Sequence, residues 1–149
     1  MNQVPTIKVD VVLENNAKLP LYSTEGAAGG DLYAAISQPL VIPAEARALV
    51  PTGLRMAIPD GYELQIRPRS GLALKSGITV LNSPGTVDSD FRGVIGVILM
   101  NHSLEDFVVS PGDRIAQAVL APFIRPNFNI VESLDNTERG GGGFGHTGK

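Results

Sequence analysis

The sequence predicts an all-β fold in which short strands are joined by tight turns. Seventeen glycines and eleven prolines interrupt the 149 residues at short intervals, which favours strands and turns over long helices. Residues 62–67 (Tyr-Glu-Leu-Gln-Ile-Arg) alternate between apolar and polar side chains, the period of a half-buried strand. One short helix is expected directly after Ser70.

The composition bounds the class of protein. A chain of 149 residues has the length of one domain with an ordinary core. It contains no cysteine, which excludes disulfides and thiolate metal sites. Its net charge of −3 gives no broad basic surface for nucleic acid. No signal peptide and no membrane-spanning run is visible, so we expect a cytoplasmic protein without nucleic-acid or membrane partners.

The expected strands follow one another along the chain. Residues 7–11 alternate apolar and polar side chains and should be half-buried. The nine-residue apolar run 93–101 should be a strand buried on both faces. A hairpin turn at 104–106 should lead into a return strand. The remaining strand candidates are 40–42, 47–52, 54–58, 62–67, 78–81, 107–109, 114–121 and 129–132.

The segment from Leu81 to Gly93 (Leu-Asn-Ser-Pro-Gly-Thr-Val-Asp-Ser-Asp-Phe-Arg-Gly) concentrates the most chemistry. Residues 83–85 predict a tight turn, and the β-branched residues that follow favour an extended backbone. In such a strand Asp88 and Asp90 would share one face. A polar hairpin tip would look the same, so the other clusters along the chain decide between the two interpretations.

A second cluster is Arg69-Ser70-Gly71. Ser70 could cap a helix through residues 71–75 that ends at Ser76–Gly77. The free N–H groups at the start of such a helix, with Arg69 beside them, would suit a phosphate. An ordinary solvated arginine beside a capped helix is the alternative.

Two further clusters are polar residues in permissive or apolar surroundings. Asp31 follows a run of small residues that would allow a close backbone approach, or it is simply a turn aspartate. Alternation from Arg114 places Ile115 and Gln117 on one apolar face, where the amide needs a partner in the core or on a ligand. Asp113 beside Arg114 is most simply turn support and a surface ion pair.

The last eleven residues, 139–149, contain six glycines together with an arginine, a phenylalanine and a threonine. Such a segment has no fixed fold alone, because glycine loses the most backbone freedom on ordering. A flexible linker is one interpretation. A lid that orders over a ligand is the better one, with arginine and glycine N–H groups for phosphate and phenylalanine to stack on a base.

Five clusters therefore stand in order, and together they resemble the five motifs of the trimeric deoxyuridine triphosphatase (dUTPase) family. The resemblance runs from about Ala27 to the C-terminus, and its specificity comes from all five motifs in register. The motif residues are Ala28-Gly29-Gly30-Asp31-Leu32, Arg69-Ser70-Gly71, Gly85-Thr86-Val87-Asp88 with Phe91 and Gly93, Gly112-Asp113-Arg114-Ile115-Ala116-Gln117, and Arg139 to Gly148.

The resemblance implies a distorted jelly-roll (the dUTPase-like β-clip), with residues 1–136 as the β domain and 137–149 as a flexible arm that closes over the active site. It also implies a homotrimer whose active sites are shared between subunits. The reaction would be hydrolysis of dUTP to dUMP and pyrophosphate by water attack on the α-phosphorus, which removes dUTP and supplies dUMP for thymidylate synthesis. Asp88 would activate the water and hold the 3′-hydroxyl, since an aspartate is ionised at neutral pH.

The same resemblance assigns the remaining site residues. Arg69, Ser70 and Gly71 would bind the phosphates, with Ser70 near the bridging oxygen of the leaving group. Asp31 and Gln117 would contact Mg²⁺ and the triphosphate through water, which suits an ion that dehydrates reluctantly. The uracil would be read by the hairpin residues Asn82, Gly85 and Val87, and Thr86 would also bind the substrate. The arm would contribute Arg139, Phe144, Gly145 and Thr147.

Two positions depart from the family pattern. Phe91 stands where most members have tyrosine, whose ring packs under deoxyribose and leaves no room for a 2′-hydroxyl. The ring is kept and the phenol is lost, so we expect sugar discrimination to survive. Gly30 stands where a larger residue is common.

Two other functions compete with dUTP hydrolysis. A dCTP deaminase shares the fold, but it lacks such an arm and uses a glutamate that is not found near Arg69. A non-catalytic nucleotide-binding module would bind dUTP without turnover, and an intact Asp88 and arm argue against it.

Overall fold

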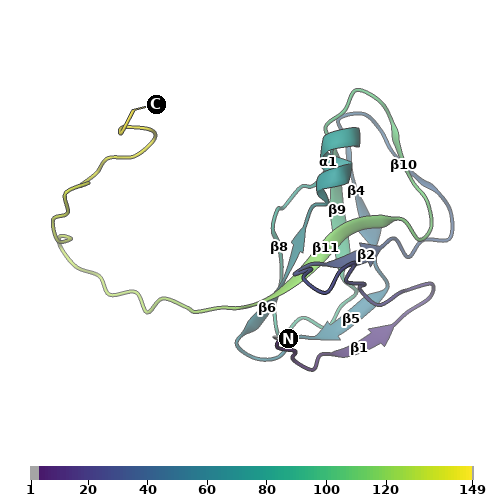
Figure 1. Ribbon diagram of the computed structural model, residues 1–149, viewed down its shortest axis with the longest axis horizontal. Helices are drawn as coiled ribbons and strands as arrows, with labels where there is room; N and C mark the ends of the chain where they lie inside the picture. Colours follow the sequence, from purple (N-terminus) through teal and green to yellow (C-terminus); the bar gives the residue numbers. More distant parts are fainter. Residues whose placement is uncertain (1–3, 149) are drawn as a thin grey trace.

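The computed structural model describes residues 4–148 (Figure 1). Residues 1–3 of the expected β domain 1–136 and residue 149 of the expected arm 137–149 lie outside the described residues. Within 4–148 the chain forms eleven strands and one helix, so the all-β prediction is confirmed. The elements are β1 (Asp10–Leu13), β2 (Gly30–Tyr33), β3 (Leu40–Ile42), β4 (Arg47–Pro51), β5 (Leu54–Ala57), β6 (Tyr62–Arg67), α1 (Ser70–Ser76), β7 (Ile78–Val80), β8 (Gly85–Val87), β9 (Gly96–Asn101), β10 (Phe107–Val109) and β11 (Arg114–Pro122).

The strands pair antiparallel in several small sheets. β11 lies between β2 and β6, and β8 extends this sheet on the far side of β6. A second sheet has the order β4-β9-β7, and β1 pairs with β5 and β10 with β3. One continuous core fills the space between them. Its largest fully buried apolar side chains are Leu32, Ile42, Leu54, Ile78, Ile95, Leu99, Ile115, Val50, Val80, Val97 and Val109.

Most expected strands are found within a few residues of their predicted bounds, and 40–42, 62–67 and 107–109 match fully. Four details of the prediction were wrong. The first strand starts at Asp10, because only Asp10–Leu13 pair with β5. The strand 107–109 pairs with β3, so it is no hairpin return. Residues 96–101 alternate in burial, so they are not equally buried on both faces. Residues 129–132, all described, form no strand.

A β-bulge in β11 corrects another expectation. The register with β2 shifts between Arg114 and Ala116, so Ile115 and Ala116 are both buried. An extra residue in one strand breaks the period of two at that point. Ile115 therefore enters the core, and it does not share a face with Gln117 as simple alternation predicted.

Helix α1 begins one residue away from the expected cap. Arg69 occupies the N-cap position with an extended backbone and no side-chain capping bond within the described residues, and Ser70 is the first helical residue. The C-terminus is as predicted. Gly77 adopts φ 64°, and its N–H donates to the carbonyl of Ala73 at 3.2 Å, since glycine takes the left-handed conformation without a steric cost.

Beyond β11 the chain leaves the folded body as a long extended segment (Figure 1). The large apolar side chains Ile124, Phe128, Ile130 and Leu134 are each at least 85% exposed. Backbone hydrogen bonds in 137–148 span only three residues, as from Gly140 N to Thr137 O. This segment is therefore held by local turns within the described chain. Among residues 4–148, no helix has the length and apolarity needed to span a bilayer.

Asn101 ties the end of β3 and the turn between β9 and β10 to the end of β9. Its fully buried amide donates to the carbonyls of Ile42, Pro43 and Glu105 at 2.8–3.3 Å. Its side-chain oxygen accepts from the backbone N–H of Ser103 at 3.0 Å. Every polar atom of this side chain is used, so the residue holds the turn between β9 and β10.

We expect Asn101→Ala to lower the free energy of unfolding by about 3 kcal/mol, because it removes three hydrogen bonds and leaves the carbonyl of the buried Ile42 without this donor. Urea unfolding at one fixed protein concentration measures the change. The neighbouring exposed His102 serves as the control, and His102→Ala should change stability by less than about 0.5 kcal/mol. Equal effects of the two substitutions would contradict this role for Asn101.

Candidate functional site

The first candidate cluster is built around Asp31 on β2. The side chain is 12% exposed, and its carboxylate lies between two guanidinium groups, Arg69 Nε at 3.2 Å and an Arg114 terminal nitrogen at 3.3 Å. The Ser23 hydroxyl adds a third donor at 3.3 Å. A buried carboxylate requires such partners, since unpaired burial of a charge is costly.

This ion-pair network fixes the direction of the arginines. Arg69 also donates to the backbone carbonyl of Arg114 at 3.3 Å, so its guanidinium is anchored on two sides. Its side chain remains 26% exposed and that of Arg114 50%. The simple surface pair expected between Asp113 and Arg114 was wrong. Asp113 accepts from the N–H of Ser110 at 2.8 Å, which is the turn support expected of it.

Gln117 lies directly opposite Asp31 in the β2–β11 pairing and opposite Arg67 in the β6–β11 pairing. Its amide donates to the carbonyl of Pro68 at 2.9 Å, which supplies the partner that this amide was expected to need. A Cβ on Gly29 would collide with its side-chain oxygen. The polar side chains of three motifs thus meet on β2, β11 and the start of α1, where Ser70 and Gly71 are exposed.

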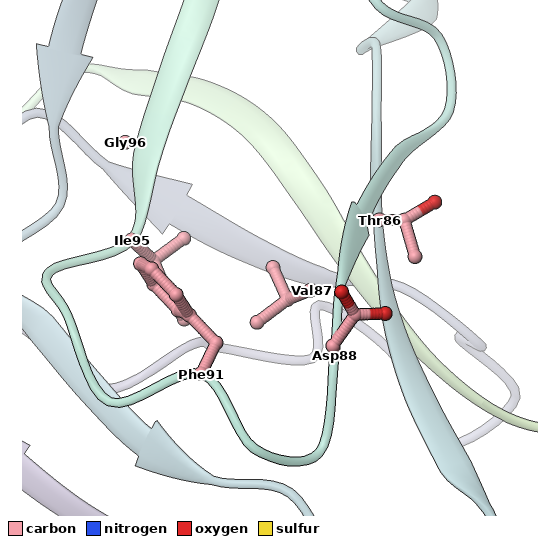
Figure 2. A pocket seen from close by; sticks show the side chains of 6 residues that line it. All are labelled: Thr86, Val87, Asp88, Phe91, Ile95 and Gly96. Atoms are coloured by element: carbon pink, nitrogen blue, oxygen red, sulfur yellow. The ribbon is translucent and has the colours of Figure 1, made fainter.

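The second candidate cluster is a small cavity at the end of β8, with a volume of about 170 Å³. Figure 2 shows the side chain of Val87 pointing toward the ring of Phe91, with the Asp88 carboxylate beside it. The lining residues are Thr86, Val87, Asp88, Phe91, Ile95 and Gly96. Most of these lining residues are apolar. The Asp88 carboxylate is the one charged group among the described residues that line the cavity.

The expected common face of Asp88 and Asp90 was wrong. β8 ends at Val87, and residues 89–90 form a turn in which the N–H of Phe91 donates to the carbonyl of Asp88 at 3.2 Å. This turn carries Asp88 and Phe91 to the same cavity and removes Asp90 from it.

A second hollow, of about 60 Å³, lies at the other end of the same hairpin. Asn82 and Gly85 line it together with Thr86 and Val87. A Cβ on Gly85 would lie 3.2 Å from Cβ of Ile66 and 3.4 Å from the amide nitrogen of Asn82. The four hairpin residues predicted to bind the substrate therefore lie around one depression.

Asp88 and Arg69 belong to opposite ends of β6. Val87 pairs with Leu64, so Asp88 is level with Glu63, whereas Arg69 follows Arg67. At about 3.3 Å per residue, the four steps from residue 63 to 67 span roughly 13 Å. One chain therefore presents its cavity and its arginine cluster as two separate surfaces.

The arm residues are not brought to either surface. Phe144 is fully exposed, and the Arg139 guanidinium donates to the nearby carbonyl of Gly142 at 2.8 Å. Gly145 and Thr147 are exposed in the same segment, which extends away from the body (Figure 1).

Sequence reasoning missed three contributors to these clusters. Arg114 belongs to one of the five motifs, but its contact with Asp31 was not predicted. That contact depends on the bulge in β11, which leaves no recognisable pattern in the sequence. Ile95 and Gly96 line the cavity, but within an apolar run they carried no signal beyond that of core residues.

Comparison with known proteins identifies the family to which this chain belongs. A family model described as dUTPase matches residues 15–148. A deoxyuridine 5′-triphosphate nucleotidohydrolase of Syntrophotalea carbinolica is 57% identical over 143 residues, covering 96% of this chain and 97% of that protein. The protein of the same name from Chlamydia pneumoniae is 58% identical over 137 residues, covering 91% of this chain and 94% of that protein.

Solved structures resemble the whole chain. The G164S mutant of the Staphylococcus bacteriophage 80alpha dUTPase, determined with dUpNHpp, has a TM-score of 0.87 at 25% identity, over 97% of this chain and all of that one. The dUTPase of phage phi11 of S. aureus has a TM-score of 0.78 at 22% identity, over 88% of this chain and all of that one. The jelly-roll expectation is thereby confirmed, and the chain belongs to the dUTPase family.

Proposed function

We propose that this protein is a dUTP diphosphatase, which hydrolyses dUTP to dUMP and pyrophosphate and so removes dUTP and supplies dUMP for thymidylate synthesis. Family membership and relatives named deoxyuridine 5′-triphosphate nucleotidohydrolase support the reaction. The single observation that carries it in the structure is the Asp88 carboxylate at the edge of a small, largely apolar cavity. The cytoplasmic location expected from the sequence stays a prediction.

Asp88 is the proposed general base. Within the described residues its carboxylate makes no ion pair and no side-chain hydrogen bond, so both oxygens are free to accept. One oxygen would orient and deprotonate the attacking water, and the other would hold the 3′-hydroxyl of the sugar. The water oxygen would bond to the α-phosphorus as the bridging oxygen leaves with pyrophosphate. In phosphoryl transfer, the positioning of the water and of the phosphates supplies most of the catalysis.

Arg69, Ser70 and Gly71 are proposed to bind the phosphates. Asp31 and the carbonyl of Arg114 orient the Arg69 guanidinium, which leaves its outer edge available for a charge-assisted bond to a phosphate oxygen. Ser70 and Gly71 are exposed beside it. A preset arginine loses less conformational freedom when the substrate binds.

The donor set around Asp31 fits an indirect contact with Mg²⁺. Asp31 and Gln117 place oxygen atoms on directly opposite strand positions, but both arginines already pair with the carboxylate. Among the described residues no group of three acidic or histidine side chains could hold an ion directly. We propose that Asp31 and Gln117 hold Mg²⁺ through water, and the bound ion would neutralise charge on the triphosphate.

A homotrimer with shared sites would unite the separated surfaces. Asp88 and Arg69 lie at opposite ends of β6 in one chain, so a neighbouring copy would have to bring its arginine cluster to the cavity. The exposed apolar side chains of 123–135 are suited to packing on another subunit. The arm 137–149 would then close over the nucleotide, with Arg139 and Thr147 on the γ-phosphate, the N–H group of Gly145 beside it and Phe144 stacked on uracil.

Pyrophosphate release from micromolar dUTP with Mg²⁺ tests the proposal, and its absence would exclude dUTP hydrolysis. Ammonia release from dCTP would indicate the deaminase instead. Tight binding of dUTP without turnover would indicate a binding module.

Asp88→Asn should lower kcat for dUTP by about 10²–10⁴-fold, the range of a lost general base. Binding of a non-hydrolysable dUTP analogue, measured by calorimetry, should persist because the amide keeps the shape of the side chain. Asp90→Asn is the matched control, since Asp90 does not line the cavity, and it should keep near-normal turnover. A normal kcat in Asp88→Asn would remove Asp88 from the chemistry.

Deletion of residues 139–149 should reduce kcat/KM for dUTP by at least about a hundredfold, because the arm supplies a phosphate-binding arginine and a stacking ring. The thermal unfolding midpoint should stay unchanged, since the hydrogen bonds of this segment are local. Unaltered kinetics in the truncated protein would restore the interpretation of the tail as a linker.

A further inference from the structure

The ring of Phe91 rests against the backbone of Gly93. A Cβ built on Gly93 would lie 2.7 Å from Cζ of Phe91, 3.1 Å from Cε2 and 3.5 Å from Cε1. The first distance is shorter than real Cβ contacts allow. Any larger residue at position 93 would therefore displace the ring.

Space, and not backbone conformation, is the reason for this glycine. Gly93 is not among the glycines with positive φ, so an alanine could adopt its backbone angles without strain. Within the described chain, the three atoms nearest to the built Cβ all belong to the Phe91 ring, so this ring is what a larger side chain would meet.

The backbone around Gly93 is fixed at several points. Arg55 Nε donates to the carbonyl of Arg92 at 3.0 Å, and the N–H of Ile95 donates to the carbonyl of Leu54 at 2.8 Å. The Arg92 side chain binds back to the carbonyl of Ser89 at 2.7 Å. A clash at position 93 would therefore be relieved by the Phe91 ring and not by the loop.

The ring of Phe91 has open space on its solvent side. Val87 and Ile95 line the cavity beside it (Figure 2) and are 9% and 2% exposed, whereas Phe91 is 43% exposed. Because the outer side of the ring faces solvent, a displaced ring can swing outward without meeting another side chain. The cavity wall next to Asp88 would then be open where the ring had stood.

From this geometry we infer that Gly93 is a specificity-determining positioning residue, which seats the Phe91 ring so that the cavity accepts deoxyribose and rejects ribose. The inference rests on the proposed function and deepens it. Phe91 is the contact residue, and Gly93 acts through it. The absent phenol of Phe91 makes this seat more important, because the ring carries no hydroxyl that could anchor it by a hydrogen bond.

The test compares kcat/KM for dUTP with kcat/KM for UTP. Gly93→Ala should lower this ratio at least about tenfold, the size of effect that a change of one methyl group has in a tight pocket. Gly26→Ala is the matched control, since a Cβ there meets no atom within 4 Å and its φ is ordinary. The control should keep the parent ratio.

A double-mutant cycle separates seating of the ring from a general disturbance. In a Phe91→Ala background, Gly93→Ala should change the ratio less than twofold, because no ring remains to displace. If Gly93→Ala alone fails to fold, Phe91→Ala/Gly93→Ala should restore a cooperative thermal transition for the same reason.

An unchanged ratio in folded Gly93→Ala, an equal loss in both backgrounds, or a double variant that does not fold would each overturn the inference. The parent protein is assayed first. If it releases no pyrophosphate from dUTP, the proposed function and this inference fail together. If it does, the variants test the inference alone.

Discussion

The pairing of β11 is the constraint on which the arginine cluster depends. Gln117 lies opposite Asp31 on one neighbour and opposite Arg67 on the other, so one residue of the central strand aligns three distant segments of the chain. The bulge before Ala116 sends Ile115 into the core and leaves Arg114 free to reach Asp31. A shift of register by one residue would turn every one of these side chains to the other face of the sheet.

Separation of function along β6 is the second organising feature. The antiparallel pairing of β6 with β8 places the Asp88 cavity at one end of β6 and Arg69 beyond the other. Under the proposed function, one subunit would hold the sugar and the triphosphate on separate surfaces. The extended, apolar segment after β11 points away from its own body, which supports the proposal that it packs on a neighbouring subunit.

Glycines act here mainly by what they leave empty. Gly29 leaves room for the Gln117 side chain, Gly85 for Ile66 and Gly93 for Phe91. Gly30, which departs from the family pattern, faces Pro20 at 2.9 Å and the Tyr22 ring at 3.5 Å from a built Cβ. The small residue therefore allows the connector before β2 to pack against the sheet, which gives this departure a physical reason.

The sequence by itself determined the all-β class, the bounds of most strands and the polar residues of the five motifs, because alternation, turn chemistry and motif order are local properties. It also anticipated that Gln117 needs a partner. Only the tertiary structure decided that Pro68 is that partner, that Arg114 pairs with Asp31 and not with Asp113, and that Asp90 turns away from the cavity. Each of these depends on a bulge, a turn or a pairing between residues far apart in the chain, and no local pattern encodes contacts of that kind.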